Sequence, residues 1–265
     1  MPDARPNDAR LIAIANQKGG VGKTTTAINL AAALAEVGHR TLLVDLDPQG
    51  NASTGLGIAP SDRTLTSYDL LIDGASLDDV AIATRHRDIW ICPATTDLSS
   101  ADLALAQSTD RTTRLRSQLG AAPGFDYVLI DCPPALGLIT VNAMVAAGSV
   151  LVPLQAEFFA LEGLSQLMLT IREVRSSANP GLRIEGVLLT MLDRRNNLAQ
   201  QVEADARDTL GELVFRTVIP RNVRLSEAPS FAQPVLTYDP ASRGSEAYRA
   251  LARELIARHH PVPTA

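Results

Sequence analysis

Two lysines, Lys18 and Lys23, are the residues whose type and spacing most clearly point to chemistry. They are the only lysines of the chain, both lie within residues 16–25, which read NQKGGVGKTT, and the other strongly basic side chains are all arginines. An ammonium is a compact, strongly hydrated point charge on a flexible stem, so it enters a crowded polyphosphate more easily than a planar guanidinium does. The intervening glycines let the backbone curl around an anion. We therefore predict a phosphate-binding loop at this segment.

The segment follows an apolar run and precedes a helical pattern, which is the context of a P-loop. In such a loop the backbone N–H groups and the helix N-terminus face the phosphates, Lys23 reaches the β and γ phosphates, and the Thr24 hydroxyl ligates Mg²⁺. The predicted cofactors are ATP and Mg²⁺. The predicted nucleotide contacts are Lys18, Gly19, Gly20, Val21, Gly22, Lys23, Thr24 and Thr25.

Carboxylates follow two further apolar runs. Asp45 and Asp47 alternate in VDLDPQGN, residues 44–51, and Asp131 ends a second run. In open α/β sheets, ligands bind at the carboxyl edge of the strands. Asp131 is expected to hold Mg²⁺ through water, with Asp45 supporting the ion or its waters, and Asp47 to orient the water that attacks the phosphate. An aspartate at a strand end is also common as a simple turn or cap residue.

Composition narrows the remaining classes. The chain has 265 residues, 46% of them hydrophobic, which suits one domain over residues 1–265 with residues 1–9 as a disordered extension. The net charge of −5 confines any nucleic-acid contact to a local arginine patch. The absence of a signal peptide and of a membrane span predicts a cytoplasmic protein without a membrane partner. Cys92 and Cys132 are expected to be buried apolar side chains, and the four histidines to be surface residues without partners.

Short apolar runs bounded by turn residues alternate with helical patterns, which is typical of parallel strands covered by helices. Strands are predicted over residues 11–15, 41–45, 88–92, 127–131, 150–154, 184–192 and 214–219. Helices are predicted over residues 24–37, 98–107, 111–119, 138–147, 162–176, 198–210 and 242–259, with a packed loop over residues 222–240. The predicted fold is α/β, a doubly wound, mostly parallel sheet of about seven strands with helices on both faces.

The loop departs from the pattern G-x-x-x-x-G-K-[ST], because Gln17 stands at the first glycine position and Lys18 follows it. This exchange resembles the deviant Walker A group of ATPases. Residues 15–26, 47–51 and 218–230 resemble the ParA/Soj chromosome-partitioning ATPases, and the match extends over about the whole chain. The resemblance implies an ATP-bound homodimer that encloses two nucleotides, in which Lys18 of each subunit reaches the phosphates held by the other. Lys18, Asp47 and Asp131 would then be the catalytic residues.

The resemblance also implies a base site, a DNA site and a partner. The PRN segment of the family lies beside the adenine, so Pro220 and Asn222 are the expected base contacts. The ATP-bound dimer of the family binds double-stranded DNA without sequence preference, which requires contacts to phosphates. The expected DNA contacts are Arg195 and Arg224 first, and then Arg194, Arg221 and Arg243; the alternative is that these arginines are solvated or ion-paired. A ParB-type centromere-binding protein would stimulate hydrolysis and release the dimer from DNA, which implies a nucleoid-associated protein.

Three other functions use this kind of nucleotide site. A MinD-like membrane-positioning ATPase would need a basic amphipathic C-terminal helix that docks on lipid, whereas the alanines and glutamates of residues 246–258 suit packing on a sheet. An electron-transfer ATPase like the nitrogenase iron protein would share an iron–sulfur cluster through paired cysteines, but prolines rather than glycines flank Cys132. A small-molecule kinase or ligase would need an acceptor pocket, which no motif of the sequence indicates.

Overall fold

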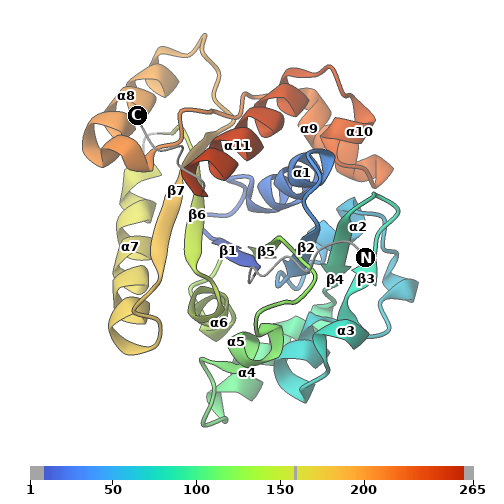
Figure 1. Ribbon diagram of the computed structural model, residues 1–265. Helices are drawn as coiled ribbons and strands as arrows, with labels where there is room; N and C mark the ends of the chain where they lie inside the picture. Colours follow the sequence, from blue (N-terminus) through green and yellow to red (C-terminus); the bar gives the residue numbers. More distant parts are fainter. Residues whose placement is uncertain (1–8, 158–159, 260–265) are drawn as a thin grey trace, which may run out of the picture.

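A seven-stranded sheet runs through the middle of the computed structural model, which describes residues 9–157 and 160–259 (Figure 1). The strands are β1 (Arg10–Ile14), β2 (Thr41–Asp45), β3 (Ile82–Ala83), β4 (Ile89–Cys92), β5 (Tyr127–Asp131), β6 (Ser149–Gln155) and β7 (Arg183–Thr190). Their order in the sheet is β3-β4-β2-β5-β1-β6-β7. Only the pairing of β3 with β4 is antiparallel. The predicted α/β fold with a mostly parallel sheet is confirmed.

The inner strands β2 and β5 are buried along their whole length. Strands that are covered on both faces need apolar residues at nearly every position, which is why these runs were visible in the sequence. The predicted bounds of these two strands, residues 41–45 and 127–131, match the observed ones. The bounds of β1, β4, β6 and β7 differ from the predictions by one or two residues at an end.

The predicted strand over residues 214–219 is wrong. This segment runs beside β7, and the N–H groups of Phe215 and Ile219 donate to the carbonyls of Val187 and Leu189 at 2.9 and 2.8 Å, but no continuous ladder forms between them. The backbone N–H groups of Arg216 and Thr217 donate instead to the two carboxylate oxygens of Glu254, each at 2.8 Å. Because these N–H groups bond to a helix side chain, the ladder to β7 is interrupted. The seventh strand is the edge strand β3, which is too short to show a periodic pattern in the sequence.

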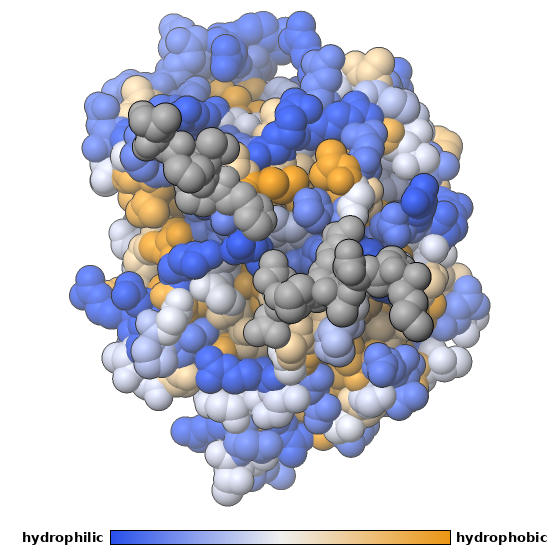
Figure 2. All heavy atoms as spheres, in the orientation of Figure 1, coloured by the Kyte–Doolittle hydropathy of each residue, from blue (hydrophilic) through white to orange (hydrophobic). Residues whose placement is uncertain are grey.

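Helices cover both faces of the sheet, with α1 and α11 on one face and α4 to α7 on the other (Figure 1). Their bounds are α1 (Lys23–Glu36), α2 (Asn51–Gly55), α3 (Leu77–Val80), α4 (Ala101–Ala106), α5 (Arg114–Leu119), α6 (Leu138–Ala146), α7 (Ala160–Ser177), α8 (Asn197–Leu210), α9 (Val223–Glu227), α10 (Val235–Tyr238) and α11 (Arg243–His259). The seven predicted helices are all present, although α4 and α5 each begin three residues later than predicted. Hydrophilic residues cover much of the face drawn in Figure 2, with smaller apolar areas between them.

Two apolar clusters pack on the two faces of the sheet. Ile12 and Ile14 of β1 belong to the cluster with α1 and α11, whereas Ala13 belongs to the cluster with α4 to α7. This division follows from the strand, because successive side chains point to opposite faces. Helix α11 contributes Leu251 and Leu255, both with 0% of their surface exposed. The amphipathic C-terminal helix therefore packs its apolar face against the protein core.

The predicted loop over residues 222–240 is wrong, and the predicted N-terminal extension is described only at its last residue. Residues 222–240 contain the short helices α9 and α10 rather than a loop, which the prolines of the segment concealed. The expected N-terminal extension, residues 1–9, lies outside the described residues except for Ala9. The backbone N–H of Ala9 donates to the carbonyl of Ala121 at 3.2 Å, and Ala9 is buried, so the predicted extension is wrong at this residue.

The prediction that the histidines are surface residues without partners is wrong for His259. Its side chain is 2% exposed, and Nε2 lies 2.9 Å from Oε1 of Glu185. Ser149 donates to the other carboxylate oxygen at 2.6 Å, and the His259 ring stacks on Tyr127. Burial alone would raise the pKa of Glu185, but the hydrogen bonds from His259 and Ser149 outweigh it and hold that pKa below its usual value. This network pins the end of α11 to β6 and β7.

Glu185→Gln is expected to lower the free energy of unfolding at pH 7 by about 1–3 kcal/mol, because the buried partners lose a charged acceptor. The folded pKa of Glu185 is depressed, so its contribution is present above the unfolded pKa and is lost as the pH falls through the folded pKa. Urea unfolding at pH 7 and at about pH 3.5 tests this, with the difference between the two proteins narrowing at the lower pH. Equal stability at pH 7 would contradict the assignment.

Candidate functional site

The carboxyl ends of three neighbouring strands, β1, β5 and β2, carry the residues singled out in the sequence. β1 leads into the loop of residues 15–22, and Asp45 and Asp131 are the last residues of β2 and β5. Asp45 and Asp131 are partners in the β2–β5 register, so their side chains lie on the same side of the sheet. The topology thus brings the loop and both carboxylates to one edge, where open α/β sheets bind ligands.

The glycines of the loop serve two needs. Gly20 and Gly22 have φ angles of 74° and 86°, which side chains with a Cβ rarely tolerate. Gly19 has no such angle, and a Cβ built there would meet nothing within 4 Å. Neither the backbone angle nor a neighbouring atom among the described residues requires glycine at position 19. A ligand that comes close to the backbone would explain why this position lacks a side chain. Gly22 caps α1 without a side-chain hydrogen bond, which leaves first-turn N–H groups for an anion.

Lys23, the first residue of α1, lies folded across the loop. It is 6% exposed, and its Nζ donates to the backbone oxygen of Lys18 at 3.0 Å. Burial lowers the pKa of Lys23, while the negative charges of Asp131 and Asp47 act against that shift. An ammonium that is bonded to one carbonyl and lies in the field of two carboxylates is placed to meet an anion in the loop.

Asp131 has the most unusual electrostatic environment of the site. Its side chain is fully buried, and neither carboxylate oxygen has a partner at good hydrogen-bond geometry in the described part of the chain, although the Thr24 hydroxyl lies near enough to favour the charged form. Burial raises the pKa of Asp131 well above its usual value, and the charge of Asp45 raises it further, while Thr24 and Lys23 oppose the shift. A buried carboxylate without a partner is costly unless a cation or donor reaches it.

These donors fit magnesium. No cluster of three or more His, Cys, Asp or Glu side chains able to hold a metal occurs among residues 9–157 and 160–259. Magnesium is commonly held by one or two carboxylates together with waters and phosphate oxygens, so a complete protein cage is not required. Asp131, with the neighbouring Thr24 hydroxyl, offers the protein's share of such a site.

Asp45 is also buried, but its oxygens are engaged. One accepts from the N–H and the hydroxyl of Ser53 at 2.9 and 2.7 Å, and the other accepts from the N–H of Asp47 at 3.2 Å. Burial raises the pKa of Asp45 to about 6 although these hydrogen bonds oppose it. The half-buried Asp47 in turn accepts from the N–H of Gln49 at 3.0 Å. The observed role of Asp45 is to hold the turn that carries Asp47, and its expected role beside the metal stays a prediction.

A pocket of about 410 Å³ opens beside the P-loop. Its lining includes Pro220 and Asn222, the two residues predicted to contact the base, together with Thr190 at the end of β7 and the next residue, Met191. This cavity is called the base pocket. The Thr190 hydroxyl donates to the carbonyl of Val21 at 2.9 Å and ties the P-loop to β7. Thr190 and Met191 were not predicted, because no motif marks them and only the place of β7 in the sheet brings them here.

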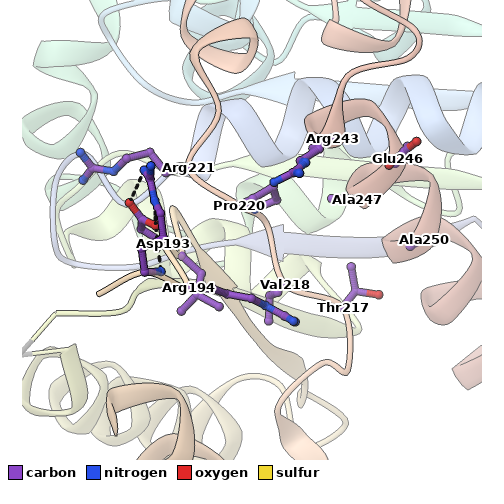
Figure 3. A pocket seen from close by; sticks show the side chains of 12 residues that line it. Asp193, Arg194, Thr217, Val218, Pro220, Arg221, Arg243, Glu246, Ala247 and Ala250 are labelled. Carbon is purple, nitrogen blue, oxygen red and sulfur yellow. Dashed lines mark hydrogen bonds and ion pairs between the residues drawn. The ribbon is translucent and has the colours of Figure 1, made fainter. Parts of the chain in front are cut away.

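Four of the five predicted DNA-binding arginines line one cavity of about 750 Å³ between the end of β7, the segment that ends at Arg221, and α11 (Figure 3). We call this cavity the arginine groove. Its charged lining residues are Arg194, Arg195, Arg221, Arg243, Asp193 and Glu246. All four arginines are exposed, so positive charge predominates in the groove.

The two arginines expected first differ from the others. Arg224 is not among the lining residues of the arginine groove, and it forms ion pairs with Glu227 at 2.8 Å and Asp239 at 3.2 Å. Arg195 lines the groove but donates to both carboxylate oxygens of Asp193, at 3.0 and 2.9 Å. The structure therefore brings Arg194, Arg195, Arg221 and Arg243 together and leaves Arg224 apart.

Comparison with known proteins connects this geometry to a family. The model of a family described as an AAA domain matches residues 9–184. The chromosome partitioning protein ParA of Caulobacter vibrioides is 58% identical over 255 residues, which cover 95% of this chain and 96% of the relative. The sporulation initiation inhibitor protein Soj of Bacillus subtilis is 52% identical and covers 94% of this chain and 98% of its own.

A solved structure shares the fold at lower identity. Cobyrinic acid a,c-diamide synthase from Mycobacterium smegmatis, with bound ADP and magnesium, has a TM-score of 0.83 and 36% identity, and 96% of each chain is covered. The identity to ParA and Soj is higher and spans nearly the whole chain. The chain therefore belongs to the ParA/Soj family of chromosome-partitioning ATPases.

Proposed function

We propose that this protein hydrolyses ATP, that its ATP-bound dimer holds DNA without sequence preference, and that hydrolysis releases the DNA. The observation that carries the proposal is a buried lysine near a buried carboxylate that forms no well-aligned hydrogen bond within the described part of the chain. Lys23 and Asp131 lie beside a loop with first-turn N–H groups free for an anion. A nucleotide with its magnesium ion would supply an anion to Lys23 and a cation to Asp131 at the same time.

The residues of the site would divide the work as follows. Backbone N–H groups of residues 18–25 would bind the phosphates, and Pro220 and Asn222 would hold the base in the adjoining pocket. Bound ADP and magnesium in the 36%-identical structure support both cofactors. Mg²⁺, held by Thr24 and through water by Asp131, would neutralise phosphate charge when bound. Asp47 would orient the attacking water, in a turn that Asp45 fixes.

Lys18 would act across a subunit boundary. Its side chain is 42% exposed, whereas Lys23 is buried within its own subunit, so Lys18 is the lysine accessible to a second copy of the chain. In the dimer its ammonium would offset the charge of the phosphoryl group bound by the other subunit. ATP would thereby hold the two subunits together.

The arginine groove is the proposed DNA contact. Arginines that bind phosphates give affinity without sequence readout and a strong dependence on salt. Pro220 and Arg221 line both the arginine groove and the base pocket, so the two sites share a wall. The name of the ParA relative, a chromosome partitioning protein, supports DNA partition as the purpose of the cycle. A ParB-type partner would stimulate hydrolysis and so move or position the cargo DNA.

The membrane alternative has less support. Among the described helices, none is apolar and long enough to cross a membrane. The apolar residues of α11 that a lipid-docking helix would expose, among them Tyr248, Leu251 and Leu255, are at most 1% exposed. A helix that buries its apolar face in the core offers little to a lipid surface.

The electron-transfer and ligase alternatives are also weaker. Cys92 and Cys132 are both buried; burial raises the pKa of Cys92 to about 12 and also raises that of Cys132. A cluster shared between subunits would need thiolates that reach a subunit surface. The name of the diamide synthase is consistent with a ligase. However, the identity of this chain to that protein, 36%, is well below its 58% identity to ParA, which favours the partition ATPase.

Asp131→Asn is expected to stabilise the nucleotide-free protein by at least about 1 kcal/mol at pH 8, because it removes a buried charge without a partner. The gain shrinks as the pH falls, since the raised pKa of Asp131 lets the wild type take up a proton. Thermal unfolding without nucleotide measures both effects. The same variant should lose most of the stabilisation that ATP with Mg²⁺ gives the wild type. A variant less stable than the wild type at pH 8 would be inconsistent with an unpaired carboxylate.

Asp47→Ala is expected to bind ATP and DNA but to lose hydrolysis by at least about a hundredfold, because binding uses the P-loop and water orientation uses the carboxylate. Phosphate release and binding of a fluorescent ATP analogue measure the two properties separately. Lys23→Ala is the contrasting variant, which should lose nucleotide binding. Loss of ATP binding in Asp47→Ala would show that Asp47 has another role.

Arg243→Ala should weaken DNA binding of the ATP-bound protein severalfold and reduce the slope of log affinity against log salt by about 1. Arg243 is chosen because it lines the arginine groove but not the base pocket. Fluorescence anisotropy with two unrelated duplexes over a salt series gives both values. Arg116→Ala, an exposed arginine of α5, is the matched control. A larger effect of Arg116→Ala or Arg224→Ala would place the DNA contact elsewhere.

A further inference from the structure

The signature lysine of the P-loop is paired with a carboxylate of its own chain. Nζ of Lys18 donates to Oε2 of Glu157 at 2.7 Å. The other oxygen of Glu157 accepts a hydrogen bond from the side-chain amide of Gln155, the last residue of β6. The N–H of Glu157 also donates to the carbonyl of Gln155 at 2.8 Å, so a tight turn aims the carboxylate. Glu157 therefore presents one oriented oxygen to the lysine.

The topology explains why these two residues meet. β6 is the parallel neighbour of β1, so the loop after β1 and the turn after β6 emerge side by side at the carboxyl edge of the sheet. Asn16 fastens one to the other, because its amide donates to the carbonyl of Pro153 at 2.7 Å and its side-chain oxygen accepts the N–H of Lys18 at 3.0 Å. Backbone and side chain of Lys18 are thus both held toward β6.

We propose that Glu157 is a positioning residue that holds Lys18 on its own subunit while no ATP-bound partner is present. This inference rests on the proposed role of Lys18 at the nucleotide of a second subunit. When two ATP-bound subunits meet, the partner's polyphosphate carries more negative charge than one carboxylate and displaces Glu157 from Lys18. Glu157 thereby sets the concentration of ATP-bound protein at which the dimer forms.

The strength of the pair suits an exchangeable contact. Lys18 and Glu157 have side-chain exposures of 42% and 50%, and ion pairs exposed to this degree contribute little to stability. Breaking one such contact raises the dissociation constant of the ATP-bound dimer by about threefold. Two pairs must break when the dimer forms, so the dissociation constant rises by about tenfold in all. A buried, fully satisfied pair would have locked the lysine instead.

The first experiment reads the contact in the nucleotide-free protein and does not depend on any activity. The chain has only two lysines, and Lys23 is buried, so acetylation by an amine-reactive reagent followed by peptide mass spectrometry reports on Lys18, with Lys23 as the internal reference. Glu157→Gln keeps an oxygen for Gln155 but removes the charge. The labelling rate of Lys18 should rise about two- to threefold in this variant, while the rate of Lys23 stays constant. An unchanged rate at Lys18 would overturn the proposal.

The control is Glu203→Gln, which removes a carboxylate paired with Arg207 on α8 at 2.8 Å, away from the P-loop. It should leave the labelling of both lysines at the wild-type rate. A rise of Lys18 labelling in Glu203→Gln equal to that in Glu157→Gln would show a general loosening of the protein and would also overturn the proposal.

The second experiment measures dimer formation by sedimentation velocity with a non-hydrolysable ATP analogue and Mg²⁺ over a range of protein concentrations. Glu157→Gln should form the dimer at about tenfold lower concentration than the wild type. An equal or weaker dimer in Glu157→Gln would overturn the proposed release of Lys18. If the wild type itself forms no dimer with the analogue, the proposed function fails instead, and the labelling result still decides whether Glu157 holds Lys18.

Discussion

The buried carboxyl group of Asp131 is the constraint on which the proposed nucleotide site depends. The carboxylate lies at the end of the inner strand β5, fully buried, and next to the equally buried Asp45. Two neighbouring carboxylates in a low dielectric repel each other, and Asp45 relieves its own cost through Ser53 and Asp47 whereas Asp131 does not. The site can therefore be stabilised by whatever brings positive charge to Asp131. In the proposed function, binding of the cation and the nucleotide would therefore stabilise the folded protein as well as prepare the reaction.

The sheet order determines which residues can take part. Because β1 lies between β5 and β6, its P-loop has the carboxylates of β5 and β2 on one side and the turn after β6 on the other. β7 follows β6, and Thr190 at its end reaches the carbonyl of Val21 in the P-loop. A single edge of one sheet therefore holds the proposed phosphate, metal and water-orienting groups together with the contact that restrains Lys18. The proposed chemistry and the proposed subunit contact would thus lie at adjacent strand ends.

The base pocket and the arginine groove are separated by one short segment. Pro220 and Arg221 line both cavities, and the N–H of Arg221 donates to the carbonyl of Leu192 at 3.1 Å, which joins this segment to the chain after β7. A base that packs against Pro220 would touch the same backbone that forms a wall of the groove. In the proposed function, this arrangement would give bound nucleotide and bound DNA a direct physical route by which to influence each other within one subunit.

The sequence by itself determined the elements whose signal is local. Strands buried on both faces require unbroken apolar runs. The P-loop requires glycines where φ is positive, as at Gly20 and Gly22. Both features depend only on residues that are close together in the sequence. The bounds of β2 and β5 and the glycine-rich turn between β1 and α1 followed from them. The segment after Val214 was wrongly predicted as a strand. Its residues do not reveal that Glu254 of a distant helix accepts hydrogen bonds from its N–H groups.

Only the tertiary structure decided what distant segments do to one another. It placed Thr190, Met191 and Glu157 at the P-loop and Glu185 on His259, although many other pairings of such residue types are compatible with the same sequence. It also separated Arg224 from the other candidate arginines, which charge composition could not do. The physical reason is that hydrogen bonds, ion pairs and burial depend on distances between side chains, and these distances are fixed by strand order and helix packing rather than by spacing along the chain.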